Sequence, residues 1–208
     1  LKSGRGMDDL LSLFSGLSSS LVSDSLDRLR GSQGLKAMHG VQPVLGRALT
    51  VQVAPGDNLY IHAALRQAQP GDVLVIDGAG NTERALVGEI LLSAARARGV
   101  IGFVVDGAVR DVDAFIRDGF PCYGRSITPR GPYKNGPGAI NQVISVDGNV
   151  VSPGDVVLGD ADGVVFVAAE QAAQVARQAR ELHANEQRIL ADIAAGVYDD
   201  AWLNSVIK

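Results

Sequence analysis

Short apolar runs bounded by Gly, Pro or Asp alternate along the chain with stretches in which apolar residues recur every three or four positions. The first pattern is typical of buried strands and the second of amphipathic helices. We therefore expect strands at 46–53, 72–76, 100–105, 121–123, 142–146, 155–158 and 163–167. We expect helices at 60–68, 87–98, 113–117 and 170–195, after an N-terminal helical region at 7–29.

The order of these elements predicts the fold class. Strands alternate with helices early in the chain and cluster into hairpins later, which indicates a mixed α/β architecture. With 208 residues, of which 46% are hydrophobic, the chain is long enough for one domain with a substantial core. Residues 1–6 precede the first Met and are interpreted as an expression scar, so the predicted domain spans 7–208 and ends in the helix at 170–195.

Composition and charge argue against several classes of protein. A net charge of -4, scattered Lys and Arg and 5% aromatic residues provide no basic stripe or stacking platform for nucleic acid. No apolar run approaches the roughly 20 residues of a membrane span and no signal-peptide pattern is present, so we expect a cytoplasmic protein without a membrane partner. The single cysteine, Cys122, excludes an internal disulfide and fits a reducing compartment.

The segment 88–111 carries the strongest candidate chemistry. Glu89 lies in the first turn of a predicted helix, and Arg110 and Asp111 follow the next predicted strand. A helix and the strand after it run antiparallel in such a unit, and we expect the Asp-Gly pair at 106–107 to turn the chain. Glu89 should therefore lie beside Arg110 and Asp111, although twenty residues separate Glu89 from Arg110.

These residue types suit a site for a metal ion and a small oxyacid. Free N–H groups at a helix start favour an anion, and the planar Arg110 guanidinium can hold a carboxylate or enolate oxygen. Asp111 and Glu89 are hard oxygen ligands for Mg2+ or Mn2+. The competing interpretation is structural, because Arg-Asp pairs are common in solvated loops and the helix dipole alone explains Glu89.

Other motifs lack the spacing that their chemistry requires. The run 77–80 follows a strand, but a dinucleotide fingerprint would need glycine in place of Glu83, so we interpret this run as a turn at the rim of the site. The loop 131–138 has the wrong residue order for a phosphate cradle and is predicted to lie at the surface or at an interface. The histidines have no ligand spacing and are interpreted as structural: His39, His62 and His183.

Four stretches of the sequence resemble one protein family. They are 71–111, S-S-S-L-V-S-D-S-L-D-R-L at 18–29, G-P-Y-K-N-G-P-G at 131–138 and S-P-G-D-V-V-L-G-D-A-D-G-V at 152–164. On these stretches the sequence resembles the RraA-like family, and the match covers nearly the whole chain after Met7, in the family's order. That family includes class II 4-hydroxy-4-methyl-2-oxoglutarate/4-carboxy-4-hydroxy-2-oxoadipate aldolases. The resemblance implies a β/β/α swivelling-domain-like fold and assembly as homotrimers or hexamers.

The resemblance also implies a reaction. We expect a divalent-metal-dependent lyase that cleaves a 4-hydroxy-2-oxo diacid to pyruvate and a second oxoacid, or that decarboxylates oxaloacetate, in both cases through a pyruvate enolate. Asp111 would ligate Mg2+ or Mn2+ directly, and Glu89 would hold the metal through water. Arg110 would bind the substrate and stabilise the enolate as its charge develops.

The same resemblance places the substrate and a further acid. The substrate carboxylate would meet the helix start after Gly88, at the backbone amides of Ile90, Leu91 and Leu92. A glutamate from the C-terminal helix of a neighbouring subunit would complete the site. Glu186 occupies the matching position, and the nearby Glu181 is the alternative.

A second class of function is compatible with the resemblance. RraA, a protein inhibitor of ribonuclease E, belongs to the same family, and a protein-binding regulator of that type would carry the metal site as a relic. The form of the loop 131–138 differs from that of the aldolases, which leaves the substrate open. A methyltransferase would need a glycine-rich cofactor loop in a doubly wound sheet, and that context is not predicted.

Overall fold

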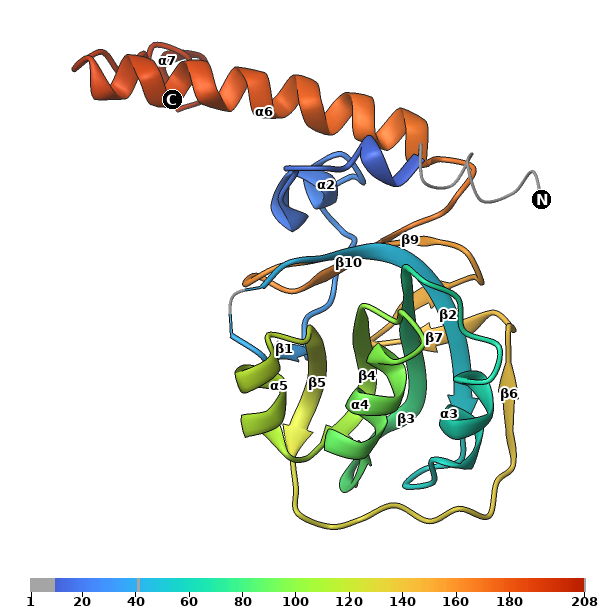
Figure 1. The fold of residues 1–208 in the computed structure, drawn as a ribbon. Helices are drawn as coiled ribbons and strands as arrows, with labels where there is room; N and C mark the ends of the chain where they lie inside the picture. Colours follow the sequence, from blue (N-terminus) through green and yellow to red (C-terminus); the bar gives the residue numbers. More distant parts are fainter. Residues whose placement is uncertain (1–9, 41, 208) are drawn as a thin grey trace.

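The computed structural model describes residues 10–40 and 42–207, which form a curled sheet with helices against it and a long C-terminal helix (Figure 1). The sheet has the strand order β1-β5-β4-β3-β2-β9-β10, β6 pairs with β2, and β7 and β8 form a separate hairpin. The strands are β1 (Lys36–Ala37), β2 (Val44–Val53), β3 (Asp72–Val87), β4 (Gly102–Val109), β5 (Cys122–Ile127), β6 (Gly138–Ile140), β7 (Ile144–Val146), β8 (Asn149–Val151), β9 (Val156–Gly159) and β10 (Val164–Val167). The helices are α2 (Ser19–Asp24), α3 (Leu59–Ala64), α4 (Glu89–Arg96), α5 (Val112–Asp118), α6 (Ala172–Ala194) and α7 (Leu203–Val206).

The middle of the sheet is parallel and covered on both faces. β2 pairs with β3, β3 with β4 and β4 with β5, all in parallel, and each connection between them passes through a helix. Helices α3, α4 and α5 lie side by side over one face (Figure 1). The β7–β8 hairpin contributes its apolar side chains to the core on the other face. All residues of β4 are buried, which explains why its sequence is apolar without alternation.

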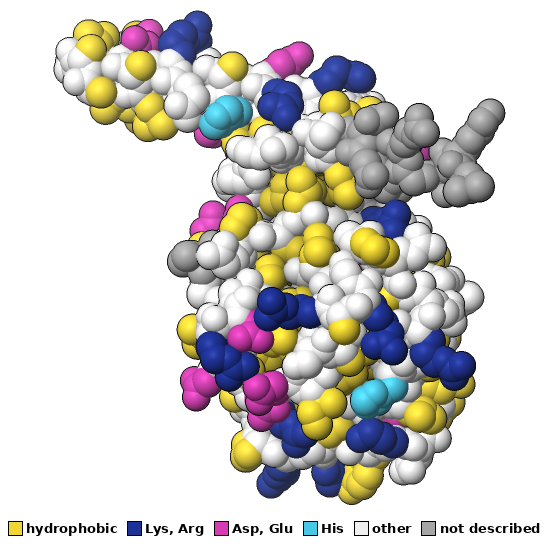
Figure 2. Space-filling view, viewed as in Figure 1, with side chains coloured by type: hydrophobic (Ala, Val, Ile, Leu, Met, Phe, Trp, Pro, Cys, Tyr) yellow, Lys and Arg dark blue, Asp and Glu magenta, His cyan; other side chains and the backbone are white. Residues whose placement is uncertain are grey.

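The antiparallel side of the sheet supports the C-terminal helix. β9 pairs with β2 and with β10, and these strands pack against α2 and the first turns of α6. Beyond Ala179 most of α6 is exposed, and the helix extends away from the body (Figure 1). Ile189, Leu190 and Ile193 are exposed on this distal part, where hydrophobic side chains are visible at the surface (Figure 2). Within the described residues, no helix has the length and apolar character needed to cross a membrane.

The structure confirms the mixed α/β prediction and corrects two turns. β3 does not end at Ile76 but continues to Val87 through bulges, so the predicted turn at 77–80 is part of a strand. The turn predicted at 106–107 is also wrong, because Asp106 and Gly107 lie inside β4 and pair with Asp77 and Asn81. The bulges place extra residues of β3 opposite β4, and this keeps both strands in one ladder beyond the Asp-Gly pair.

The ends of the chain and the shortest strands were predicted least completely. The described part of the region 7–29 contains α2, which begins at Ser19 behind the N-cap Ser18, whose hydroxyl accepts from the Leu21 amide. Residues 1–9 lie outside the described residues. The helix predicted at 170–195 is present as α6. β1, β6 and β8 were not predicted, because strands of two or three residues are too short to show a period.

Phe103 on β4 links the sheet to the helix that follows it. Its fully buried ring lies edge-on to Phe120 and Phe115, with centroid distances of 5.0 and 6.2 Å. Phe103→Ala should lower the free energy of unfolding by about 3–5 kcal/mol, because the lost ring leaves a cavity beneath α5. Urea denaturation measures this, with Ile116→Ala on the exposed side of α5 as a control expected to change stability by roughly 0.5 kcal/mol or less. A loss below about 1 kcal/mol for Phe103→Ala would contradict this role of the ring.

Candidate functional site

The pairing of β3 with β4 creates the site. The last paired residues of the two strands are Val87 and Val109, so the chain leaves both strands at the same edge of the sheet. The Arg110 amide donates to the Val87 carbonyl at 3.1 Å, and this hydrogen bond keeps the ends of β3 and β4 together. Gly88 and Arg110 are therefore neighbours, and the predicted proximity of the helix start to the Arg-Asp pair is confirmed.

Asp111 connects the start of α5 to the start of α4. It adopts the left-handed conformation, with φ 56° and ψ 41°, at the N-cap of α5. Its Oδ2 accepts a hydrogen bond of 3.0 Å from the Glu89 amide at the start of α4. A Cβ at Gly88 would collide with this Oδ2 and would lie 3.0 Å from Cγ of Arg110. A side chain at position 88 would therefore displace the Asp111 carboxylate from its place against the start of α4.

Glu89 and Asp111 lie at the rim of the site, with side chains 51% and 42% exposed. Glu89 Oε1 accepts from Arg117 Nη2 at 2.8 Å, and the Arg117 Nε donates to Asp118 at 2.9 Å. The Asp111 Oδ1 atom has no protein partner in the part of the chain that the structure describes. Mg2+ commonly receives one or two carboxylates from a protein and keeps several waters, so the open Oδ1 of Asp111 fits a hydrated divalent cation, whereas the Glu89 carboxylate is paired with Arg117. No cluster of three or more His, Cys, Asp or Glu side chains suited to a metal occurs among the described residues.

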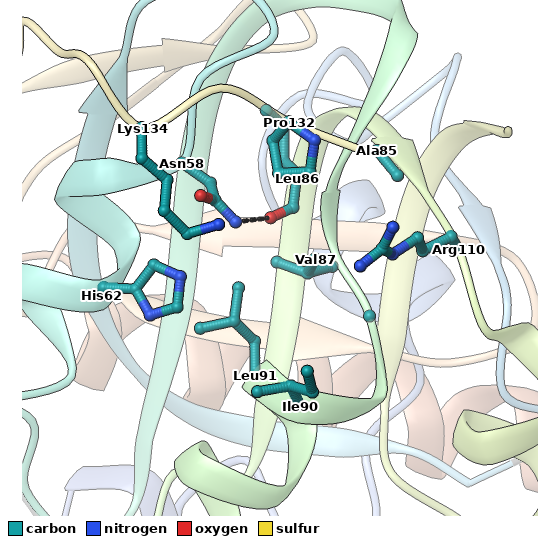
Figure 3. A pocket seen from close by; sticks show the side chains of 11 residues that line it. Asn58, His62, Ala85, Leu86, Val87, Ile90, Leu91, Arg110, Pro132 and Lys134 are labelled. Atoms are coloured by element: carbon teal, nitrogen blue, oxygen red, sulfur yellow. Dashed lines mark hydrogen bonds between the residues drawn. The ribbon is translucent and has the colours of Figure 1, made fainter. Parts of the chain in front are cut away.

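A small pocket adjoins these acids on the inner side of Arg110 (Figure 3). Its volume is about 70 Å³. Because a single water molecule needs roughly 10–15 Å³ by this kind of measure, the enclosed space holds a few non-hydrogen atoms, and a longer ligand would extend from it toward the open side of the pocket. It is lined by Asn58, His62, Ala85, Leu86, Val87, Gly88, Ile90, Leu91, Arg110, Pro132 and Lys134.

Cationic and polar groups face each other across this pocket. Arg110 lies on one side, while Lys134, His62 and Asn58 lie on the other (Figure 3). Burial, reinforced by the neighbouring Lys134 charge, lowers the pKa of His62. His62 is therefore neutral near pH 7 and can donate or accept a hydrogen bond, while Arg110 and Lys134 supply positive charge.

Asn58 presents an unpaired acceptor at this pocket. Only 4% of the residue is exposed, and its Nδ2 donates to the Leu86 carbonyl at 3.0 Å. Its Oδ1 has no hydrogen-bond partner within residues 10–40 and 42–207. A buried oxygen without a partner is costly, so a ligand or water that donates a hydrogen bond here would satisfy it.

The start of α4 offers two amides and not three. The Ile90 and Leu91 amides have no protein acceptor among the described residues, and both residues line the pocket. The Leu92 amide donates to the Gly88 carbonyl at 3.0 Å, and Leu92 is fully buried. The Leu92 amide is therefore already paired, because the fourth residue after an N-cap closes the first helical hydrogen bond, and the predicted contact of Leu92 with the substrate stays a prediction.

Sequence reasoning missed three of the pocket residues. His62 was interpreted as structural, but it lines the pocket. The loop 131–138 lies at the surface as predicted, and it also supplies Lys134 to the pocket. Asn58 and His62 are four residues apart at the start of α3, and this spacing was an available signal. Lys134 gave none, since it reaches the pocket only because the connection from β5 to β6 passes beneath the strand ends (Figure 1).

Glu186 and Glu181 lie on the exposed part of α6. Neither lines the pocket of its own chain, which is built by α3, α4 and the strand ends. Figure 1 shows α6 on the far side of the molecule from the loop that carries Lys134. The single chain therefore brings together Glu89, Arg110 and Asp111 but not Glu186.

Comparison with known proteins places the chain in a family. The model of the RraA-like family (Aldolase/RraA) matches residues 19–166. A Halalkalibacterium halodurans protein named "Putative 4-hydroxy-4-methyl-2-oxoglutarate aldolase" is 39% identical over 180 residues, 86% of each chain. The structure of an uncharacterized protein from Pseudomonas syringae superposes with a TM-score of 0.81 at 28% identity, over 91% of this chain and 94% of the other. Streptomyces coelicolor RraAS2, described as an unusual member of the RNase ES inhibitor RraA family, gives 0.76 at 28% identity, over 86% and 94%. The fold expected from the resemblance is confirmed, and the chain belongs to the RraA-like family.

Proposed function

We propose that this protein is a divalent-metal-dependent lyase that cleaves a 4-hydroxy-2-oxo diacid of the 4-hydroxy-4-methyl-2-oxoglutarate type, or decarboxylates oxaloacetate. The observation that carries the proposal is one pocket with Arg110 and Lys134 on opposite sides and two free helix amides at one end, with the Asp111 carboxylate against the adjoining start of α4. The similarity to a protein named as an aldolase supports the same class. The chemistry of the reaction then assigns each group a task.

The substrate is held at both ends. One carboxylate accepts from the Ile90 and Leu91 amides, where the α4 dipole adds positive potential. Lys134 binds the second carboxylate of the diacid as a charged donor on the opposite side. The apolar side chains of Leu86 and Val87 line the pocket between them, and a neutral monoacid would leave Lys134 without its counter-charge.

The cation site uses the two acids at the rim. Asp111 would hold Mg2+ or Mn2+ directly, and Glu89 would hold it through water. When bound, the cation supplies Lewis-acid polarisation of the keto oxygen. Arg110 donates to the same region of the substrate and stabilises the negative charge that develops as the enolate forms.

The electrons and protons balance without a further reactant. In the aldol cleavage the bond between C3 and C4 breaks, its electron pair stays on C3 of the pyruvate enolate, and the proton of the C4 hydroxyl leaves. Glu89 orders water at the rim and provides the route for that proton. Protonation of C3 then gives pyruvate. A coupled assay for pyruvate release, run on a panel of 2-oxo acids with added Mg2+ or Mn2+ and then with EDTA, tests the proposal.

The second candidate is a protein-binding regulator of the ribonuclease E type. The likeness to RraAS2 and the exposed apolar side chains on α6 favour it. Two acids, an arginine and a lysine around one small pocket favour turnover, since a binder has no need of them. Metal-dependent pyruvate release would support the lyase. Its absence across the whole panel, together with capture of a ribonuclease E scaffold segment, would support the regulator.

We further propose a homo-oligomer in which Glu186 of one chain completes the pocket of the next. Light scattering should then give a mass several times the 21.7 kDa of one chain.

Glu186→Gln should lower turnover, while the matched Glu181→Gln variant should not. Because Arg110→Lys and Glu186→Gln would damage opposite halves of a shared site, mixing the two inactive variants should restore part of the activity. An active monomer, or no restoration on mixing, would refute the shared site.

Arg110→Lys should not be conservative. A lysine keeps the charge but cannot reproduce the planar two-point hold of the guanidinium on an oxyacid. Losing one such contact in the transition state typically costs about 100- to 1000-fold in turnover, which steady-state kinetics would measure. Arg98→Lys, on the exposed side beyond α4, is the control. A rate for Arg110→Lys within about threefold of wild type would remove this guanidinium from the mechanism.

Asp111→Asn should separate chemistry from stability. Asparagine keeps the shape and tolerates the left-handed conformation but lacks the charge that a hard divalent cation requires. Calorimetric titration should show that Mn2+ binding collapses, while the apoprotein melts close to the wild-type temperature. Asp113→Asn, two residues further along on α5, should bind Mn2+ as the wild type does. Undiminished Mn2+ binding by Asp111→Asn would rule out Asp111 as the ligand.

A further inference from the structure

The loop 131–138 reaches the pocket as a strap held by one buried carboxylate. Asp57 is only 3% exposed, and it accepts hydrogen bonds from three backbone amides. The Leu59 amide donates to Oδ1 at 2.9 Å, whereas the Asn135 amide and the Gly136 amide, at 3.1 Å, donate to Oδ2. One oxygen therefore binds the start of α3 and the other binds the strap.

The charge on Asp57 is maintained by these donors. Burial by itself raises the pKa of this carboxyl, but the amide donors from Asn135, Leu59 and Gly136, together with the Lys134 charge, outweigh burial and lower the pKa. Asp57 is thus ionised near pH 7, where a carboxylate accepts all three hydrogen bonds.

Residues 56–58 hold the backbone on both sides of Lys134. On one side of Lys134, the Tyr133 amide donates to the Gly56 carbonyl at 2.9 Å, and the Tyr133 carbonyl accepts from the Asn58 amide at 3.0 Å. On the other side, Asn135 and Gly136 are fixed by Asp57. The backbone of Lys134 is therefore fixed on both sides, although its own side chain lies at the surface.

The same carboxylate fixes what Lys134 faces. Through the Leu59 amide, Asp57 anchors the first turn of α3, and this helix presents Asn58 and His62 to the pocket. Figure 3 shows Lys134, Asn58 and His62 together on one side of the pocket, opposite Arg110. The separation between the ammonium of Lys134 and the guanidinium of Arg110 therefore depends on the hydrogen bonds that Asn135 and Gly136 donate to Asp57.

We propose that Asp57 is a positioning residue that sets the place of Lys134 and, through it, the selectivity of the pocket for a second carboxylate. This inference rests on the proposed function of the pocket. Asp57 touches no substrate; it acts through Lys134. The alternative is that Asp57 only stabilises the fold, and the two roles differ in which ligands a substitution affects.

A double-mutant cycle in the full-length protein distinguishes these roles. The variants are Asp57→Asn, Lys134→Met and their combination, and calorimetry in Mg2+ measures the affinity for two probes. In oxalate the two carboxylates are directly joined, so we expect it to bind only at the Arg110 end of the pocket. In 2-oxoglutarate three carbons separate the two carboxylates, so the second one should also reach Lys134. In Asp57→Asn an uncharged amide, which has only one oxygen, replaces the carboxylate that accepts from Leu59, Asn135 and Gly136, so the strap is held less tightly at Asn135 and Gly136.

The expected pattern is selective and non-additive. Asp57→Asn and Lys134→Met should each weaken 2-oxoglutarate binding about tenfold, the size of one lost charge-assisted contact, and leave oxalate within about twofold. The double variant should bind 2-oxoglutarate no more weakly than Lys134→Met alone. Asp155→Asn is the matched control: this buried carboxylate accepts from the Ser152 amide at 2.8 Å away from the pocket, so both affinities should be unchanged.

Several results would overturn the inference. Equal losses for both probes in Asp57→Asn, or additive losses in the double variant, would mean a structural role alone. Where Asp57→Asn does not fold, Arg84→Met tests the strap from its other end, since Arg84 donates to the Gly131 carbonyl at 2.8 Å and its guanidinium lies over the Tyr133 ring. That variant should weaken 2-oxoglutarate severalfold and spare oxalate, and an unselective loss would contradict the proposal. Failure of the wild type to bind either probe would instead refute the proposed function, and this inference with it.

Discussion

The parallel pairing of β3 and β4 is the constraint on which the site depends. Because the ladder ends at Val87 and Val109, the residues that follow the two strands lie side by side. A helix begins after each strand, α4 after β3 and α5 after β4. The interval of twenty residues between Glu89 and Arg110 is the length of one helix and one strand returning to the same edge. The carboxyl ends of parallel strands are a common location for ligand sites in α/β proteins for this reason.

The residues at this edge separate charge in a way that suits one ligand class. Positive groups, Arg110 and Lys134, line the pocket, while the half-exposed carboxylates of Glu89 and Asp111 lie outside its lining, beside Arg117 and Arg110. An anionic ligand inside and a cation at the rim would neutralise both sets. Gly88 makes the arrangement possible, since only a residue without a side chain leaves room for Asp111 against the start of α4.

The sequence predicted the parts of the site that are local to one helix-strand unit. Glu89, Arg110 and Asp111 followed from helix periodicity, the Gly88 boundary and an apolar strand, even though the turn at 106–107 was wrong. β4 ends at Val109, four residues beyond the predicted end of the strand, and at the same edge of the sheet. Lys134 could not be predicted, because its place depends on a long connection fixed by the burial of Asp57 and by hydrogen bonds between distant segments. Short strands such as β1 and β6 were missed for a related reason: their neighbours in the sheet, rather than their own pattern, define them.

The central claim is that the α4 start and Asp111 together bind an oxyacid and a divalent cation. The most direct measurement is a crystal structure of the protein with Mn2+ and oxalate, using anomalous scattering to locate the metal. The account predicts an anomalous peak at the Asp111 carboxylate and oxalate density in contact with the Ile90 and Leu91 amides and with Arg110. Oxalate and Mn2+ bound elsewhere, or an anomalous map with no peak at Asp111, would contradict it.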